Sequence, residues 1–498
     1  MDMSRRSFLA VGAVTGLGAM AWLTGCAPPK RGSMLAGLQS RLKGQVLVPE
    51  DPGYSAASEP TNGRYLSVMP LAVAVVADES DVVECINWCK ENGIQPVARG
   101  RGHSYAGFST TEGLVINLSR LNAVVVDRQA GTVTTGGGAL NQDLSDTLNK
   151  GPHFLPVGTC VGIGLGGLVL GGGIGFNTHW AGLTCDHLLD TQMVTADGSL
   201  ISANSRSNPD LLWACKGAAG GSLGINTQFT FSLVEVPTSV VYFQFEFRGS
   251  DAAFEVFKRF DTLMQTAPAG LNAVCTAEAV PIAERAQNAA IRSMVRGQYV
   301  GTESEARDLL APISSIAGMT SQTLEPLSFW QAQSNLSTMN PQPHSFAEPN
   351  RFARDRLPDD LLAGLVDALE NCPSQSAEAT GSVWLFGWVG GPVVSKVAPK
   401  DTAYFHRDVS LILRATVVWP NDAPAEVSDG LLRWSEEVMT RATPHTLDQS
   451  YQNFPNRALT DYLQNYYGEN LTRLVKVKAK YDPQNLFNNA QSIPVAMP

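Results

Sequence analysis

The sequence predicts an α+β fold organised as two lobes, and three observations lead to this prediction. A helical pattern near the N-terminus lies between two short apolar strands. After Pro237 the chain changes to a strand in which apolar and polar residues alternate, as in a half-buried sheet. The chain has 498 residues, of which 44% are hydrophobic, so it is long enough to form two substantial cores.

The first lobe opens with a strand at 68–76, a helix at 81–92 and a strand at 95–98. Three more short strands are expected at 114–118, 123–127 and 132–135. The second lobe begins with the alternating strand 240–247, and its further elements are expected at 251–265 (helix), 279–301 and 303–310 (helix).

A glycine-rich run separates these strands from the second lobe. Nine of the eighteen residues from Gly158 to Gly175 are glycine, so the segment lacks the side chains that stabilise a helix. We expect a backbone surface whose N–H groups approach an anion such as a pyrophosphate. The alternatives are a turn that lets two strands approach, and a Rossmann loop, which the glycines running on to Gly175 argue against.

Two reactive side chains lie in such loops. Cys160 opens the glycine-rich run, and His103 lies 57 residues earlier in a second loop, Arg99 to Gly107. A single His or Cys is usually structural, but the pairing of both with phosphate-type loops is specific.

With these motifs the chain resembles the berberine-bridge-enzyme-like branch of the FAD-linked oxidases, which share the vanillyl-alcohol-oxidase (PCMH-type) flavin fold. The resemblance covers nearly everything after residue 60. The segments that carry it are Arg99 to Tyr105, Cys160 to Gly175, Gly182 to Asp186, Val194 to Gly198, Asp210 to Gly217, Gly220 to Ile225, Tyr466 to Leu474 and Tyr481 to Ile493. Arg101 replaces a usual glycine, and Ser222 a usual asparagine.

The resemblance implies a PCMH-type FAD-binding lobe, an antiparallel-sheet substrate lobe and a C-terminal segment that returns to the FAD lobe. The corresponding ranges are 1–26 (signal peptide), 27–60 (N-terminal lead), 61–237 (FAD-binding domain), 238–450 (substrate-binding domain) and 451–498 (berberine-bridge-like segment).

The cofactor implied is FAD attached twice, to His103 through the 8α carbon and to Cys160 through carbon 6. The other residues expected to contact it are Arg99, Gly100, Arg101, Gly102, Ser104, Gly162, Ile163, Gly166, Gly167, Gly172, Gly173, Gly175, Gly224 and Ile225. No metal site is expected, because Cys85 and Cys89 have no second ligand pair.

The reaction implied is hydride transfer from an alcohol, a hemiacetal or a secondary metabolite to the flavin, while a protein base removes the O–H proton. Relatives often end a Tyr-x-Asn-Tyr motif with the proposed base, but Phe454 stands there in this chain. The role would pass to Tyr451, to a residue of the second lobe or to water. Arg414 interrupts an apolar strand, and its guanidinium could stabilise a reduced flavin or an acidic substrate.

The electron acceptor implied is O2 or a quinone. In relatives the third residue after the flavin cysteine gates oxygen, and larger side chains there accompany dehydrogenases. Ile163 occupies this position. The additional methylene of Ile163 favours slow reaction of the reduced flavin with oxygen, because packed protein interiors are sensitive to a change of one methylene.

The N-terminus indicates export. Arg5 and Arg6 form a twin-arginine pattern for the twin-arginine export machinery, and a weakly apolar stretch leads to a lipobox-like sequence at Cys26. We expect an extracytoplasmic bacterial lipoprotein with a lipid tether at Cys26. The alternative is an uncleaved anchor, for which the apolar run is short. The net charge of −10, without a basic block, argues against nucleic-acid binding.

Two other functional classes stay open. A binding lipoprotein could use the fold without turnover, and would contain no flavin. A flavoprotein lyase or cyclase would hold a flavin that substrate never bleaches. The intact His103 and Cys160 argue against the first class only.

Overall fold

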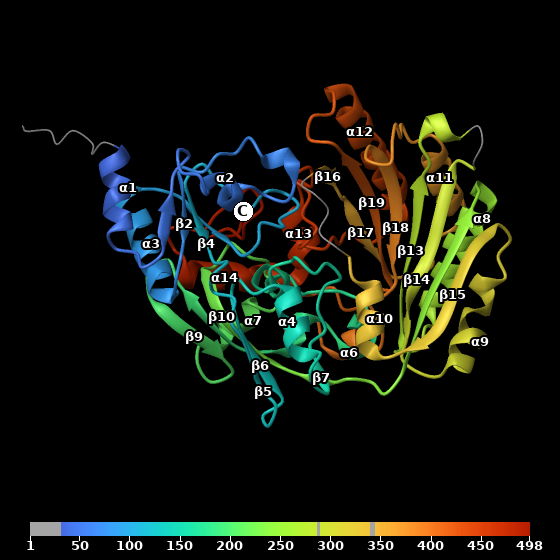
Figure 1. Ribbon diagram of the computed structural model, residues 1–498, viewed down its shortest axis with the longest axis horizontal. Helices are drawn as coiled ribbons and strands as arrows, with labels where there is room; N and C mark the ends of the chain where they lie inside the picture. The colour runs from blue at the N-terminus through green and yellow to red at the C-terminus, as the bar shows by residue number, and fades with distance from the viewer. Residues whose placement is uncertain (1–30, 286–288, 339–343) are drawn as a thin grey trace, which may run out of the picture.

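The computed structural model describes residues 31–285, 289–338 and 344–498, which form two lobes side by side (Figure 1). The twin-arginine pattern and Cys26 lie outside the described residues. Within the described part, no helix combines the length and the apolar character needed to cross a bilayer.

The first lobe begins with a four-stranded sheet in the order β1-β2-β4-β3. Its strands are β1 (Gln45–Leu47), β2 (Ala72–Val75), β3 (Pro96–Arg99) and β4 (Leu114–Asn117). β2, β4 and β3 run parallel, and α3 (Glu79–Asn92) makes the crossover from β2 to β3. The Asp78 carboxylate caps the start of α3, and Gly93, at a φ of +63°, ends it.

Residues 31–60 belong to this lobe and are not a separate lead. β1 pairs with β2, and α1 (Arg31–Gln39) buries Leu35 and Leu38 against α3. The apolar residues of the segment thus contribute to the core, which the sequence did not indicate.

A second sheet of the lobe has five antiparallel strands in the order β5-β6-β10-β8-β9. These are β5 (Val124–Asp127), β6 (Thr132–Gly136), β8 (Leu188–Val194), β9 (Leu200–Asn204) and β10 (Ile225–Ser232), while β7 (His153–Phe154) pairs with β11 (Val234–Glu235). The helices of this region are α2 (Tyr54–Ser58), α4 (Asn141–Leu148), α5 (Leu165–Leu170), α6 (Thr178–Ala181) and α7 (Pro209–Ala214).

The short helix α5 contradicts the expectation that the glycine-rich run holds no helix. Leu165, Leu168 and Val169 of α5 are buried in the core of the first lobe. Tertiary burial of one apolar face compensates for the low helix propensity of the two glycines within it. The rest of the run, including Gly158 to Gly164, is loop, as expected.

The second lobe is an eight-stranded antiparallel sheet in the order β15-β12-β14-β13-β18-β19-β16, with β17 also paired to β19. Its strands are β12 (Val240–Arg248), β13 (Leu271–Ala279), β14 (Ile291–Tyr299), β15 (Met319–Leu327), β16 (Ser345–Ala347), β17 (Asn350–Ala353), β18 (Thr380–Phe386) and β19 (Leu411–Trp419).

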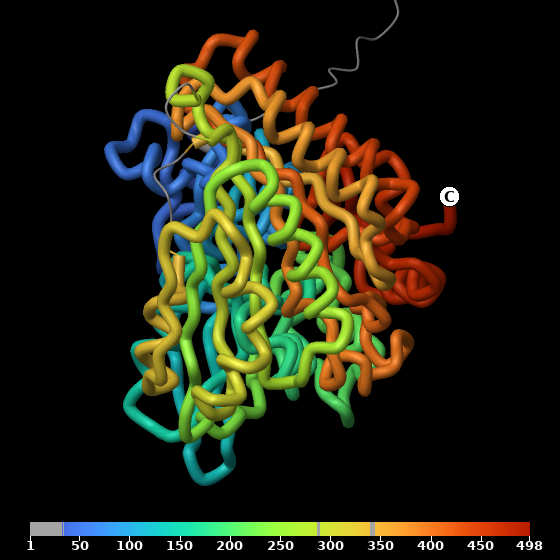
Figure 2. The backbone as a smooth tube through the Cα atoms, turned by 90° about the vertical axis from the view of Figure 1, so that its right-hand side faces the viewer, coloured from blue at the N-terminus to red at the C-terminus, as the bar shows by residue number. Residues whose placement is uncertain are grey.

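Helices cover the outer face of this sheet. They are α8 (Ser250–Gln265), α9 (Glu303–Ser314), α11 (Asp359–Glu370) and α12 (Ala425–Ala442). Figure 1 shows α8, α9 and α11 on the side away from the first lobe, and Figure 2 views the lobe from that side. Phe243, Phe245 and Phe247 of β12 pack under the helices, so the alternate residues of the strand face the first lobe.

The C-terminal segment returns to the first lobe. It contains α13 (Tyr462–Tyr467) and α14 (Leu471–Tyr481), and Figure 1 shows α14 below β2 and β4 and above β9 and β10. The Lys478 ammonium of α14 donates to the Ser222 and Phe487 carbonyls and to the Asp482 carboxylate at 2.6–2.7 Å. α10 (Phe329–Leu336), in contrast, extends from the second lobe onto the first and packs Phe329 against Phe154.

Candidate functional site

The two predicted anchor residues stand on loops of the first lobe. His103 follows β3, and Cys160 precedes α5. The second lobe reaches Cys160 through Thr338, whose hydroxyl donates to the Cys160 Sγ at 3.0 Å. The backbone of Thr338 also pairs with that of Thr159 and Val161 at 3.0 and 3.2 Å, which fixes the cysteine loop against the second lobe.

Tyr105 lies between the histidine anchor and the second lobe. Its ring lies 5.7 Å from the His103 imidazole and 5.0 Å from the ring of Phe346 of the second lobe, centre to centre. Burial lowers the pKa of His103, so the imidazole is neutral near pH 7. A neutral imidazole has a free lone pair for bond formation, as an anchor requires.

The glycine segments leave open space at one position. A Cβ at Gly167, in α5, would meet nothing within 4 Å, whereas at Gly100 and Gly102 it would be in ordinary contact with backbone oxygens at 3.6 Å. The two loops meet, since the Cβ position of Gly100 lies 3.9 Å from the Gly164 Cα. Backbone that is open in this way lets a phosphate approach its N–H groups.

A buried arginine adds positive charge beside these loops. Arg99 is 3% exposed and donates to the backbone oxygens of Ser109 and Ala57, while its Nη2 has no partner within the described residues. Burial lowers the pKa of Arg99 to about 10, which still leaves the group charged. The open position at Gly167 and an orphaned guanidinium N–H fit the pyrophosphate of FAD.

Five other glycines of the predicted set are required by close packing. A Cβ would lie 2.6 Å from the Gly137 carbonyl at Gly166, 2.8 Å from the Tyr404 ring at Gly172, 2.2 Å from the Thr184 hydroxyl at Gly173, 2.2 Å from the Val157 carbonyl at Gly175 and 2.6 Å from the Met193 sulfur at Gly224. The structure therefore gives these positions a reason to be glycine that does not involve a ligand.

The remaining predicted contacts lie on the same two loops or at the start of a strand. The Arg101 Nε donates to the Gly138 carbonyl at 3.1 Å, and the Ser104 hydroxyl accepts from the Phe108 N–H at 2.9 Å. The Ile163 carbonyl accepts from the Asn141 N–H at 3.1 Å. Gly162 and Gly166 flank Gly164, and Ile225 begins β10.

Tyr451, the predicted proton acceptor, is buried beside Gly173. It is 1% exposed, and its hydroxyl accepts hydrogen bonds from the Gly173 N–H at 2.9 Å and the Asn453 Nδ2 at 3.1 Å. Burial raises the pKa of Tyr451, and the two hydrogen bonds that its oxygen accepts oppose that rise. Tyr451 thus also holds the loop at Gly173 in place.

Arg414 reaches the site from β19, but not as an isolated charge. Its guanidinium pairs with the Glu348 carboxylate, and the two side chains are 7% and 12% exposed. The rings of Trp384, Phe386 and Phe454 lie 4.7, 4.6 and 5.2 Å from its central carbon. Arg414 thus reaches the site as one half of an ion pair with Glu348, and its role toward a negative flavin or an acidic substrate stays a prediction.

Four further side chains lie in this region of the structure and were not among the predicted site residues. They are Tyr105, Glu348, Thr338 and Arg296, which interacts electrostatically with Cys160. Tyr105 is part of the histidine motif and could have been inferred from it. No local pattern distinguishes the other three, because their roles arise from contacts between the lobes.

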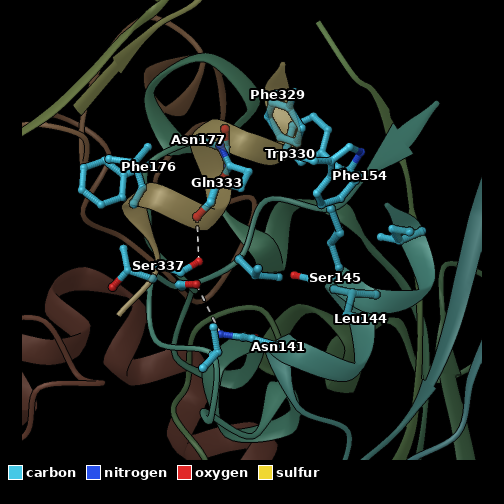
Figure 3. Close-up of a pocket in the computed structure, with 17 residues that line it drawn as sticks. Asn141, Leu144, Ser145, Phe154, Phe176, Asn177, Phe329, Trp330, Gln333 and Ser337 are labelled. Atoms are coloured by element: carbon cyan, nitrogen blue, oxygen red, sulfur yellow. Dashed lines mark hydrogen bonds between the residues drawn. The ribbon is translucent and has the colours of Figure 1, made fainter. Parts of the chain in front are cut away.

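A small pocket of about 50 Å³ borders the cysteine loop (Figure 3). It lies between α4 and α10, and its lining includes Gly158, Thr159 and Val161 but neither His103 nor Tyr105. The Asn177 amide donates to the Gln333 side chain there at 2.8 Å. The pocket is far smaller than an organic ligand requires, so it supports the loop rather than binding substrate.

The described residues contain no cluster of His, Cys, Asp or Glu suited to a metal ion. Seven cysteines are free thiols there, and all of them except Cys160 are buried. Cys160 is thus the thiol that a cofactor could reach.

Comparisons with known proteins show the family of the chain. Residues 70–204 match the FAD binding domain family, and residues 450–494 match the family described as berberine and berberine like. The uncharacterized FAD-linked oxidoreductase YgaK of Bacillus subtilis is 31% identical over 92% of this chain and 98% of its own length. Glucooligosaccharide oxidase of Sarocladium strictum is 28% identical over 86% of this chain and 88% of its own.

Solved structures show the same fold. The BBE-like 1 protein of Physcomitrella patens superposes with a TM-score of 0.81 at 26% identity, covering 94% of this chain and all of that one. A chitooligosaccharide oxidase superposes with a TM-score of 0.80 at 25% identity, covering 93% and 99%. These findings confirm the resemblance for the family, the α+β fold and FAD. The chain belongs to the berberine-bridge-enzyme-like FAD-linked oxidoreductases, flavoproteins of the PCMH-type fold.

Proposed function

We propose that this oxidoreductase holds FAD covalently through both His103 and Cys160 and oxidises a C–OH group of a hydroxyl-rich substrate, an alcohol or a hemiacetal. The observation that carries the proposal is that the second lobe contacts both anchor loops: Thr338 donates to the Cys160 Sγ at 3.0 Å, and the Phe346 ring lies 5.0 Å from the Tyr105 ring, which is itself 5.7 Å from the His103 imidazole. Arg296 of β14 interacts electrostatically with Cys160, and Glu348, paired with Arg414 of β19, interacts electrostatically with Tyr105.

The face of the second-lobe sheet that is turned toward the first lobe carries side chains that can hydrogen-bond to hydroxyl groups. The β-ladder places Gln244 opposite Arg296, Trp384 opposite both Thr276 and Arg414, and Ser382 opposite Thr416. Amide, hydroxyl and guanidinium groups hydrogen-bond hydroxyls, and an indole ring stacks on apolar C–H faces. This mixture favours a sugar-like substrate, and two relatives carry the names of oligosaccharide oxidases.

Bound FAD supplies the hydride acceptor for oxidation of a C–H bond next to oxygen. The protein contributes orientation and a route for the O–H proton. The loops of His103 and Cys160 hold two points of the cofactor, and the sheet face holds the substrate against it. Phe454, Trp384 and Phe386 surround the Arg414 guanidinium with apolar surface, which would help to exclude water from the reacting groups.

We further propose that Ile163 disfavours oxygen and that a quinone-type molecule is the preferred electron acceptor. The bulk of Ile163, three residues after Cys160, supports this. The N-terminal twin-arginine pattern and Cys26 support export by the twin-arginine machinery and a lipid tether on the outer side of a bacterial membrane. A membrane-bound acceptor would then be within reach.

The test is anaerobic bleaching of the flavin in purified holoenzyme by a panel of mono- and oligosaccharides, simple alcohols and aromatic secondary metabolites. We expect bleaching by hydroxyl-rich members, with one carbonyl or lactone product formed per flavin reduced. A flavin that no member bleaches, while a member is isomerised or cleaved, would contradict the proposal and indicate a lyase or cyclase. Protein purified without flavin would indicate a binding protein.

A further inference from the structure

An acidic side chain, Glu348, lies in the candidate site without a role in the family motifs. It stands between β16 and β17 of the second lobe, and its side chain is 12% exposed. It forms an ion pair with Arg414, whose guanidinium carbon lies 5.2 Å from the Phe454 ring that stacks on Tyr105, and Tyr105 and Glu348 shift each other's pKa. A carboxylate buried to this degree persists only with such partners.

Two asparagines hold the segments of this cluster together. The side chain of buried Asn62 donates to the backbone oxygens of Tyr105 at 2.7 Å and Phe346 at 3.0 Å, and it accepts from the Phe346 N–H at 3.2 Å. Asn350 donates to the Phe454 carbonyl at 3.0 Å and accepts from the Tyr451 N–H at 2.8 Å. Tyr105 and Glu348 therefore lie together through fixed backbone, not through a flexible contact.

Phe454 shapes the cluster around Tyr105. Its ring stacks on the Tyr105 ring with centres 5.1 Å apart and planes 5° from parallel. Phe454 has no hydroxyl, and the hydroxyl of Tyr451 accepts from Gly173 and Asn453. Tyr105 thus carries the phenol that lies between the His103 anchor and an acidic group.

The charges in the cluster suit proton transfer. Burial raises the pKa of Tyr105 well above its usual range, so the phenol stays protonated until a neighbouring base accepts its proton. Burial also raises the pKa of Glu348, although Arg414 has the opposite effect. The raised pKa makes this carboxylate a better base than an exposed one.

We propose that Tyr105 and Glu348 form the proton route of the reaction, so that this inference rests on the proposed function. The substrate O–H proton passes to the Tyr105 oxygen as the Tyr105 proton passes to the Glu348 carboxylate. The substrate C–H bond breaks with its electron pair leaving as hydride to FAD, and the carbonyl forms. Glu348 ends as a carboxylic acid and then returns its proton to solvent.

The dependence on pH follows from the groups that face Glu348. They are Arg414 from β19, Tyr105 from the loop after β3, and His344 before β16. Glu348 must be ionised to accept a proton. The rate constant of flavin reduction therefore falls as the pH drops below the pKa of Glu348.

The test compares holoenzymes of the wild type, Glu348→Gln, Glu348→Asp, Tyr105→Phe and the control Glu325→Gln. Glu325 is an exposed residue of the edge strand β15, outside the cluster. Flavin content and circular dichroism establish that each variant folds. Anaerobic stopped-flow reduction from pH 4 to 9 uses the panel member that bleaches the wild-type flavin fastest.

We expect Glu348→Gln and Tyr105→Phe to slow reduction by about 100-fold or more, as loss of a general base does. Glu348→Gln also loses the acid limb of the pH profile, Glu348→Asp retains it, and the control matches the wild type. Reduction of Glu348→Gln at the wild-type rate, with an unchanged acid limb, would overturn the proposal.

An infrared pH titration of the same holoenzymes needs no substrate. We expect a carboxylic-acid band in the wild type that is missing from Glu348→Gln and displaced in Tyr105→Phe, because the interaction of the Tyr105 phenol with Glu348 is lost. A band unchanged in Tyr105→Phe would overturn the proton route. If no panel member bleaches the wild type, the proposed function fails, and this titration still decides whether Tyr105 and Glu348 are coupled.

Discussion

At the scale of single residues, Phe454 and Glu348 determine which groups of the site can take a proton, since a phenylalanine ring cannot and a carboxylate beside Tyr105 can. Phe454 is recognisable as a lost phenol because it ends a short motif. Glu348 lies 106 residues before it and becomes a neighbour of Tyr105 only when the two lobes meet. The sequence suggested a residue of the second lobe as one of three alternatives, and the contacts of Glu348 favour that one.

The Ile163 side chain gives a prediction at this scale. Ile163→Val removes one methylene beside the cysteine loop, so we expect faster reaction of the reduced flavin with oxygen, by about tenfold or more, if packing excludes oxygen there. Stopped-flow mixing of the anaerobically reduced enzyme with oxygenated buffer measures the rate of flavin reoxidation. Leu170→Val, at the end of α5, is the matched control. Fast reoxidation of the wild type that the Ile163 variant does not change would contradict the gate.

At the scale of elements, the sequence predicted those helices and strands whose signals are local. The helix expected at 81–92 is α3 (Glu79–Asn92), because Asp78 and Gly93 mark its ends in the sequence. The alternating strand 240–247 is β12 (Val240–Arg248), because the alternation of apolar and polar residues is also a local signal. α5 was missed, because its stability comes from burial of Leu165, Leu168 and Val169, which the glycine content does not reveal.

Helix α8 gives a prediction about pH. Burial raises the pKa of Asp261 to about 6, and its carboxylate accepts from the Leu357 N–H at 3.0 Å. The folded state therefore binds this proton more tightly than the unfolded state, where the pKa is about 4. The resulting stabilisation is present below pH 4 and is lost as the pH rises through 6.

Urea denaturation between pH 4 and 7 measures this effect in the wild type and in Asp261→Asn, which keeps an acceptor oxygen but cannot ionise. We expect the free energy of unfolding of the wild type to fall relative to the variant as the pH rises. Parallel curves for the two proteins would show that Asp261 titrates normally.

At the scale of the whole molecule, the two lobes and their fold class were predictable, and the way in which they join was not. The pattern change after Pro237 and the family motifs indicated the lobes. Thr338, Asn62 and Asn350 join them through hydrogen bonds to backbone or thiol groups that no periodicity encodes. The C-terminal return was implied by resemblance, and the contacts of Lys478 give its physical basis.

Lys478 gives a prediction at this scale. Lys478 and Asp482 are both fully buried, and Asp482 also accepts from the Leu486 and Phe487 N–H groups at 2.8 Å. Lys478→Met leaves the carboxylate without its cation, so we expect the free energy of unfolding to fall by about 3 to 5 kcal/mol. Lys480→Met, which removes an exposed pair with Asp210, should cost less than about 1 kcal/mol. Equal losses of the free energy of unfolding for the two variants in urea denaturation would contradict the conclusion that Lys478 neutralises a buried carboxylate.

The most direct test of the central claim is to locate the flavin after acid denaturation. The claim is that the loops of His103 and Cys160 converge on one flavin. Proteolysis of the precipitated holoenzyme and mass spectrometry of the flavin-containing peptides should show both residues linked to FAD, and Cys160→Ala should leave the link at His103 alone. FAD released in full into the supernatant from wild-type protein would contradict the account.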